Sequence, residues 1–152
     1  MRVVSHPDLQ LVLSFKGVLE LRDSEELVRV RLGARSLDPL AVRLGVDSQD
    51  GPVNWVFARE LLVRGLHDPA GEGAVRVRPC PHPSRRAMVE VVLEGGDGFA
   101  RLLLPRGPVA HFLDSSDAFT HGELSEELLA NDLEESLAEI LAAEENQDPF
   151  GE

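Results

Sequence analysis

Residues 53–66 read Val53-Asn54-Trp55-Val56-Phe57-Ala58-Arg59-Glu60-Leu61-Leu62-Val63-Arg64-Gly65-Leu66, and the spacing of their apolar side chains changes midway. In its first half, Trp55 and Phe57 alternate with their neighbours at the period of a half-buried strand. In its second half, Leu61, Leu62 and Leu66 recur at the spacing of one helix face. The stretch therefore predicts a strand that passes directly into a helix.

Alternating apolar residues on both sides of this stretch predict further strands. The expected strands cover residues 9–15, 28–32, 40–46, 53–57, 75–78, 88–94 and 99–104. The segments between most of them are short, and short connections favour antiparallel neighbours because a parallel crossover needs a dozen or more residues. We therefore expect an α+β fold of about seven or eight antiparallel strands with a helix after the first half.

The C-terminal third predicts two more helical regions. One begins near Pro105 or Pro108, because proline suits the first turn of a helix. A long apolar stripe between residues 124 and 141 indicates the other, as one long helix or two short ones. We expect residues 1–143 to form a single domain and residues 144–152 to form an acidic, frayed tail.

Charge is distributed unevenly along the 152 residues, whose net charge is −12. All 15 basic residues precede Gly107, whereas 13 of the 27 acidic residues follow it. Such an acidic segment repels nucleic acid and anionic lipid, so neither is an expected partner. The lone Cys80 and the lack of a long apolar run or leader predict a soluble cytoplasmic protein without membrane insertion.

Motifs of catalytic chemistry are missing from the sequence. Lys16, the only lysine, lies in a strand-like run, so no phosphate-binding loop exists, and no G-x-S-x-G elbow occurs. Cys80 and His82 are too few for a structural zinc site and lie in a proline-rich connector, residues 79–86. We therefore expect no enzyme, no catalytic or metal-binding residues and no cofactor.

Arginines on the predicted strands raise one alternative function. Arg29, Arg31, Arg76 and Arg78 alternate at positions expected to face solvent, as in a single-stranded nucleic-acid-binding module. However, the chain has six Phe, one Trp and no Tyr, mostly at core-like positions. Pairing of these arginines with nearby glutamates is the simpler expectation.

The stretch 53–66 also resembles the signature of the SsgA-like sporulation and cell-division proteins of actinomycetes. In that family a strand carrying Trp and Phe runs into an A-R-[DE]-L-L-x-x-G-L helix. The matching positions are Trp55, Phe57, Ala58, Arg59, Glu60, Leu61, Leu62, Gly65 and Leu66. They are interpreted as mostly structural, and no partner-binding residue is assigned.

This resemblance implies a Whirly-like fold of two antiparallel sheets with helices, assembled as a homotrimer. It also implies a non-enzymatic scaffold at the division septum that recruits FtsZ, promotes FtsZ assembly and depends on an SsgA-type paralogue. Analogy with other Whirly-like proteins, which bind RNA or single-stranded DNA, gives single-stranded nucleic-acid binding as the alternative function.

The apolar spacing of the stretch 53–66 further predicts one packed cluster where the strand meets the helix. Its members are Trp55, Phe57, Leu61, Leu62 and Leu66. Truncation of Trp55 to alanine is expected to cost about 3–5 kcal/mol.

Overall fold

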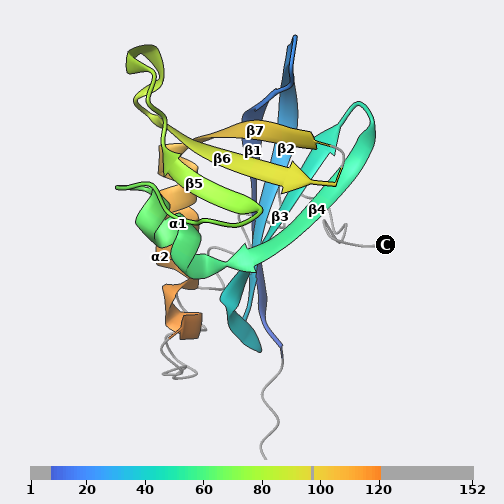
Figure 1. Cartoon of the computed structure of the whole chain (residues 1–152). Helices are drawn as coiled ribbons and strands as arrows, with labels where there is room; N and C mark the ends of the chain where they lie inside the picture. The colour runs from blue at the N-terminus through green and yellow to red at the C-terminus, as the bar shows by residue number, and fades with distance from the viewer. Residues whose placement is uncertain (1–7, 97, 121–152) are drawn as a thin grey trace, which may run out of the picture.

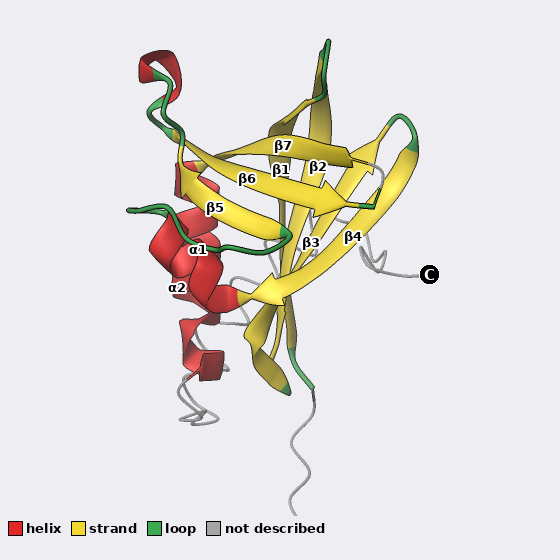
Figure 2. Ribbon diagram, in the orientation of Figure 1, coloured by secondary structure: helices red, strands yellow, loops and turns green. Residues whose placement is uncertain are grey.

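The computed structural model describes residues 8–96 and 98–120, which form strands and helices in the order drawn in Figures 1 and 2. The strands are β1 (Gln10–Glu20), β2 (Glu25–Arg35), β3 (Asp38–Ser48), β4 (Gly51–Ala58), β5 (Val75–Pro79), β6 (Met88–Gly95) and β7 (Gly98–Pro105). The helices are α1 (Arg59–Gly65), α2 (Arg106–Thr120) and a short 3-10 helix, η1 (Pro83–Arg85).

All seven strands belong to one antiparallel sheet with the order β4-β3-β2-β1-β7-β6-β5. The two separate sheets expected from the resemblance are therefore corrected to one continuous sheet in the described part of the chain. The reason is the length of β1, which pairs with β2 throughout and with β7 through Val18, Leu19 and Glu20. Gly17 lies just before this junction. A Cβ atom on Gly17 would be only 2.9 Å from the Leu103 carbonyl oxygen, so glycine allows the close approach of β7.

The sheet is curled into a half-barrel. Figure 1 shows β5, β6 and β7 running across the direction of β1–β4, with both helices at one end of the curl. The concave face carries the core, because alternate residues of every strand point inward. The fully buried strand residues include Val30, Leu32, Val42, Leu44, Val77, Val89, Val91, Leu102 and Leu104.

The helices close one end of this core. α2 buries Val109, Phe112 and Leu113 and packs against β1, β2, β3 and β7, whereas α1 packs mainly on β5. α2 begins at Arg106, with Pro108 in its first turn. The predicted helical stripe of residues 124–141 and the predicted tail 144–152 lie outside the described residues.

Candidate functional site

Gly65 is the point at which the signature stretch meets β5. A Cβ atom on Gly65 would lie 2.3 Å from Cγ1 and 2.5 Å from Cβ of Val77. Packed interiors do not tolerate such an overlap, so any side chain here would push α1 away from β5. Leu62 and Leu66 are buried in the same region. The glycine of the signature is therefore required for packing.

Two arginines fasten α1 to α2. Arg59 Nη2 donates a hydrogen bond to the Leu113 carbonyl oxygen at 2.7 Å and lies 3.7 Å from the Asp117 carboxylate. Arg106 Nη1, at the start of α2, donates to the Leu66 carbonyl oxygen at 2.6 Å. A cation here satisfies a carbonyl at the C-terminal end of α1, which the helix itself leaves unpaired. These bonds hold both helices in one arrangement.

The remaining signature residues separate into a buried and an exposed group. Phe57 is buried in the core with Leu62 and Leu66, and Leu61 and Trp55 are half-buried against it. Ala58, the N-cap residue of α1, and Glu60 in its first turn are exposed. The expected cluster is therefore only partly correct, because its tryptophan lies at the edge of the core.

Trp55 lines an open groove of about 510 Å³ between β4 and the β6–β7 hairpin. We call this hollow the apolar groove. Its large apolar lining residues, besides the tryptophan, are Leu19, Leu21, Val46, Val53, Leu93 and Phe99. Its charged lining residues among the described part of the chain are Glu26 and Asp50. Gly95, Gly96 and Gly98 contribute backbone to one wall.

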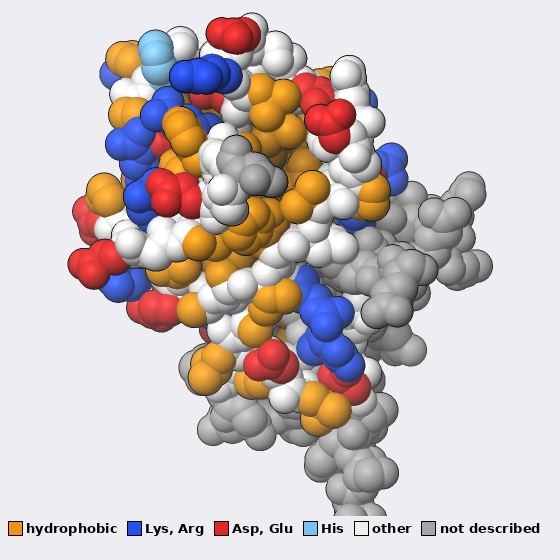
Figure 3. Space-filling model, turned by 45° about the vertical axis from the view of Figure 1, so that its right-hand side comes forward, with side chains coloured by type: hydrophobic (Ala, Val, Ile, Leu, Met, Phe, Trp, Pro, Cys, Tyr) orange, Lys and Arg blue, Asp and Glu red, His pale blue; other side chains and the backbone are white. Residues whose placement is uncertain are grey.

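Several rim side chains of the apolar groove are unusually accessible for their type. Leu21 is 43% exposed, Val53 46% and Phe99 62%. Figure 3 looks onto this side of the molecule, and hydrophobic side chains gather at the centre of the view. Contiguous apolar surface of this kind marks interaction sites in soluble proteins. The sequence did not reveal the groove, because its lining comes from six strands that are spread along the chain.

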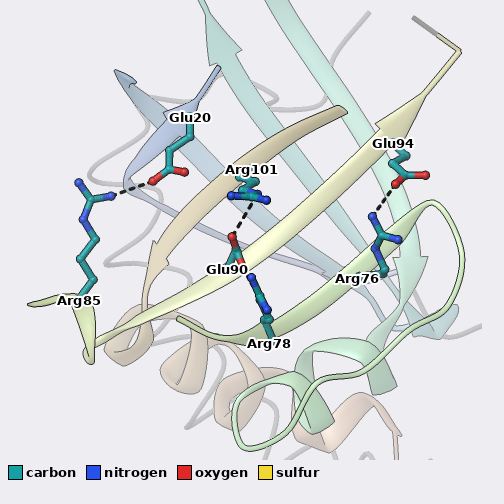
Figure 4. A network of polar contacts seen from close by, with 7 residues as sticks. All are labelled: Glu20, Arg76, Arg78, Arg85, Glu90, Glu94 and Arg101. Carbon is teal, nitrogen blue, oxygen red and sulfur yellow. Dashed lines mark hydrogen bonds and ion pairs between the residues drawn. The ribbon is translucent and has the colours of Figure 1, made fainter. Parts of the chain in front are cut away.

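The opposite, convex face of β5–β7 carries a network of charged residues (Figure 4). Glu90 is buried between Arg78, whose Nε donates to its carboxylate, and Arg101, whose Nε lies 3.5 Å away. Arg76 donates to Glu94 at 2.5 Å. The predicted pairing of strand arginines with glutamates is therefore present here, and it neutralises much of the positive charge.

Arg31 departs from the expectation of a solvent-facing strand arginine. It is only 7% exposed and makes two hydrogen bonds to the Asp47 carboxylate, at 2.6 and 2.9 Å. Gly45 lies beneath it, because a Cβ atom there would be 3.0 Å from Arg31 Nη2. The side chain therefore serves the packing of β2 against β3.

The connector of residues 79–86 shows no arrangement suited to catalysis. Cys80 is half-buried and His82 is exposed. Arg85 donates to Glu20 and Glu25, each at 3.1 Å, and so ties the connector to β1 and β2. No group of three or more His, Cys, Asp or Glu residues within 8–96 and 98–120 is arranged to hold a metal ion.

Neither the pKa shifts nor a search for membrane-spanning helices indicates another site in the described residues. Hydrogen bonding to Arg35 lowers the pKa of Asp8 below its ordinary value, and this pair lies at the start of the sheet. No helix of the described segments is long and apolar enough to span a bilayer. The arginine contacts between α1 and α2 and the apolar groove are therefore the two candidate features of the described residues.

Comparison with known proteins identifies relatives of this chain. The family model described as Streptomyces sporulation and cell division protein, SsgA, matches residues 28–123. SsgB of Streptomyces coelicolor is 35% identical over 122 residues, covering 78% of this chain and 87% of the relative. SsgB of Kineococcus radiotolerans is 43% identical over 82 residues, covering 53% of this chain and 50% of the relative.

Solved structures share the curled sheet. A structure described as "Mutations in SsgB correlate to longitudinal cell division during sporulation of Streptomyces coelicolor" aligns with a TM-score of 0.68 and 32% identity. It covers 76% of this chain and 91% of that one. The SsgA-like sporulation-specific cell division protein of Thermobifida fusca aligns with a TM-score of 0.66 and 29% identity, covering 90% and 98%.

The fold and these relatives place the chain among the sporulation-specific cell division proteins of actinomycetes. The chain belongs to the SsgA family, and the matched relatives named above include SsgB proteins. The family resemblance inferred from the signature stretch is thereby confirmed. The matches span only 50% and 62% of the SsgB proteins of Kineococcus radiotolerans and Salinispora tropica.

Proposed function

We propose that this protein is a non-enzymatic scaffold of sporulation-specific cell division. It localises in the cytoplasm to septum sites with an SsgA-type paralogue, recruits FtsZ and promotes FtsZ assembly. The observation that carries this proposal is the match of residues 28–123 to the SsgA family. The clamped helices and the exposed apolar groove support it, because they are features of a rigid body with a surface for another protein.

Pelleting of FtsZ tests the proposal directly. Addition of the purified chain to FtsZ with GTP should raise the fraction of FtsZ that sediments. A Gly65→Leu variant serves as the matched control, because it should fail to keep α1 on β5 and lose the effect. Equal sedimentation with and without the folded chain would refute the scaffold function.

Single-stranded nucleic-acid binding is the second candidate, suggested by the Whirly-like interpretation of the fold. One observation favours it: exposed Phe99 has the Arg101 guanidinium 5.7 Å from its ring centre, a pair on which a base can stack. The surrounding cations are paired with Glu90 and Glu94, which weakens the attraction to phosphate. Retention of the chain on single-stranded DNA, lost as salt rises, would favour this candidate over the scaffold.

A homotrimer is part of the scaffold that we propose. A three-fold ring uses two different surfaces on each copy. One open edge of the sheet is β4, which among the described strands pairs only with β3. The other edge, β5, is partly covered, because Ala70 and Val77 exchange hydrogen bonds of 2.8 and 2.9 Å. We therefore propose that β4 contributes to self-association.

A further inference from the structure

The rim of the apolar groove exposes side chains that the protein's own fold does not cover. Leu19, Val46 and Leu93 form a buried floor, whereas Phe99 and Val53 remain largely open to water. Trp55 lies between floor and rim, half-buried. A concave apolar site with an aromatic side chain is the usual setting of a binding hot spot. The groove is therefore built to receive apolar side chains from another molecule.

The charges around the groove define the occupant further. Both charged lining residues, Glu26 and Asp50, are acidic. Glu26 is held in place, because its Oε1 accepts a hydrogen bond of 2.7 Å from the Gln49 backbone N–H. Complementary charges at a rim steer association and exclude partners of the wrong sign. The Arg101 guanidinium lies 5.7 Å from the ring centre of the rim residue Phe99, but Glu90 lies 3.5 Å from Arg101 and offsets its charge. An apolar segment with cationic flanks therefore fits the lining of this groove better than an acidic one.

Size and net charge argue for a single segment of a partner over a second copy of this chain. The groove's 510 Å³ lies within the range of about 300–1,000 Å³ that small binding pockets occupy. A stable interface between two folded chains instead involves about 20–30 residues on each partner, whereas 14 residues line the groove. The acidic rim residues Glu26 and Asp50 also attract a cationic segment more strongly than a second copy of this acidic chain, whose self-association is proposed at β4 instead.

We propose that the apolar groove is the docking site for a segment of another protein in which Leu or Phe side chains are flanked by Lys or Arg. The segment inserts its apolar side chains against Trp55, and its cations face Glu26 and Asp50. This docking does not require that FtsZ be the partner. It is measured with synthetic peptides, so it succeeds or fails independently of the scaffold function.

The groove carries its own spectroscopic probe, because Trp55 is the only tryptophan of the chain. Its emission should shift to shorter wavelength and saturate when a peptide with a Leu/Phe centre and Lys/Arg flanks is added to the full chain. The same peptide with Glu flanks tests the charge requirement. A peptide with the basic flanks and a Ser/Gly centre tests the apolar requirement, and both should leave the emission unchanged.

Filling the groove from its glycine wall tests the location. A Cβ atom on Gly95 would point at Trp55, 3.9 Å from its Cη2, so Gly95→Leu should occupy the groove. Gly96→Leu adds a side chain at a second lining position of the groove, where a Cβ atom meets nothing within 4 Å and so does not clash. Gly73→Leu is the matched control outside the groove, with equally open space around its Cβ.

We expect both filling variants to bind the basic-flanked peptide at least about tenfold more weakly than the unmodified chain does. The Gly73→Leu variant should bind it as tightly as the unmodified chain. An unchanged Trp55 emission at millimolar peptide would overturn the docking site. Equal binding of the acidic-flanked peptide would overturn the assigned partner chemistry. An emission that shifts with protein concentration alone, together with a rise in mass, would show that a second copy covers the groove and would also overturn it.

Discussion

At the residue scale, Gly65 shows how one missing atom sets the position of a helix. The substitution Gly65→Ala places a Cβ atom 2.3 Å from Val77 Cγ1 and 3.0 Å from the Val77 backbone carbon. Backbone atoms cannot move aside as a flexible side chain can, so we expect a loss of about 1–3 kcal/mol in the free energy of unfolding. Urea denaturation followed by circular dichroism measures it.

Gly73→Ala is the control for this substitution, because a Cβ atom there meets nothing within 4 Å. Its free energy of unfolding should equal or slightly exceed that of the unmodified chain, since alanine restricts the unfolded state more than glycine does. If the two variants unfold at the same urea concentration, the contact between Gly65 and Val77 is not what fixes α1.

Two aromatic residues of β4 should differ in their contribution to stability, although the sequence pattern treats them alike. Phe57 is 8% exposed within the core, so Phe57→Ala should cost about 3–5 kcal/mol. Trp55 is half-buried beside the open groove, so Trp55→Ala should cost about 2 kcal/mol or less, below the value expected from the sequence. Thermal unfolding of both variants decides it, and a larger loss for Trp55→Ala would contradict this assignment.

At the element scale, the guanidinium of Arg59 joins α1 to α2. Arg59→Met keeps the apolar stem but removes the donor to the Leu113 carbonyl oxygen. We expect a loss of about 1.5–3 kcal/mol, because the bond involves a charged donor whose side chain is only 13% exposed. Amide hydrogen exchange should become faster in both helices. Arg64→Met, on an exposed position of α1, is the matched control and should change neither quantity.

The strands and helices were predictable from the sequence, but the pairing of each strand with its neighbours in the sheet was not. Alternation predicted all seven described strands. Each predicted range lies inside an observed strand apart from residue 9, and the observed strands extend up to five residues beyond the predicted ends. It did not predict that β1 continues to Glu20, because Gly17 interrupts the apolar pattern there. That extension brings β1 beside β7 and makes one sheet out of the two that were expected. Pairing depends on contacts between distant segments, which local periodicity does not contain.

The candidate site was predictable to the same limited extent. The signature stretch indicated which residues join strand to helix, and Phe57, Leu62 and Leu66 are buried there. The apolar groove was missed, because an alternating strand pattern does not distinguish a covered apolar residue from an open one. Phe99 illustrates this, since it begins a predicted strand yet is 62% exposed beside the groove.

At the scale of the whole molecule, the open edge at β4 bears on self-association. We expect light scattering to give a mass of about 50 kDa, three times the 16.6 kDa of one chain. Val56, 62% exposed on β4 and outside the groove lining, is the test position. Val56→Lys should lower the mass, because lysine on an edge strand blocks pairing with another chain.

Leu37→Lys is the control for the trimer experiment. Leu37 is 68% exposed between β2 and β3, so the same added charge there should leave the mass unchanged. A mass near 16.6 kDa for the unmodified chain at micromolar concentration would contradict the trimer. A trimer that persists in Val56→Lys would instead show that another surface holds it.

The acidic C-terminal third sets the salt dependence expected for FtsZ recruitment. Its 13 acidic side chains, with no basic ones, create a negative field beside a nearly neutral body. The glutamates of the predicted helix are spread around it and not clustered at one end, so we infer that they keep the scaffold soluble and face away from FtsZ. They are Glu126, Glu127, Glu134, Glu135 and Glu139. Apolar and neutral sheet surface then carries the contact.

Binding to FtsZ should therefore respond only weakly to salt. Between about 50 and about 300 mM KCl the screening length falls from ~14 to ~6 Å, which removes most attraction between exposed charges. We expect co-sedimentation with FtsZ to fall by less than about threefold across this range, because burial of apolar surface is not screened. Truncation after residue 143 removes four of the acidic residues and should leave binding unchanged, which provides the matched control. A steep loss of binding with salt would instead make the acidic segment the contact surface for FtsZ.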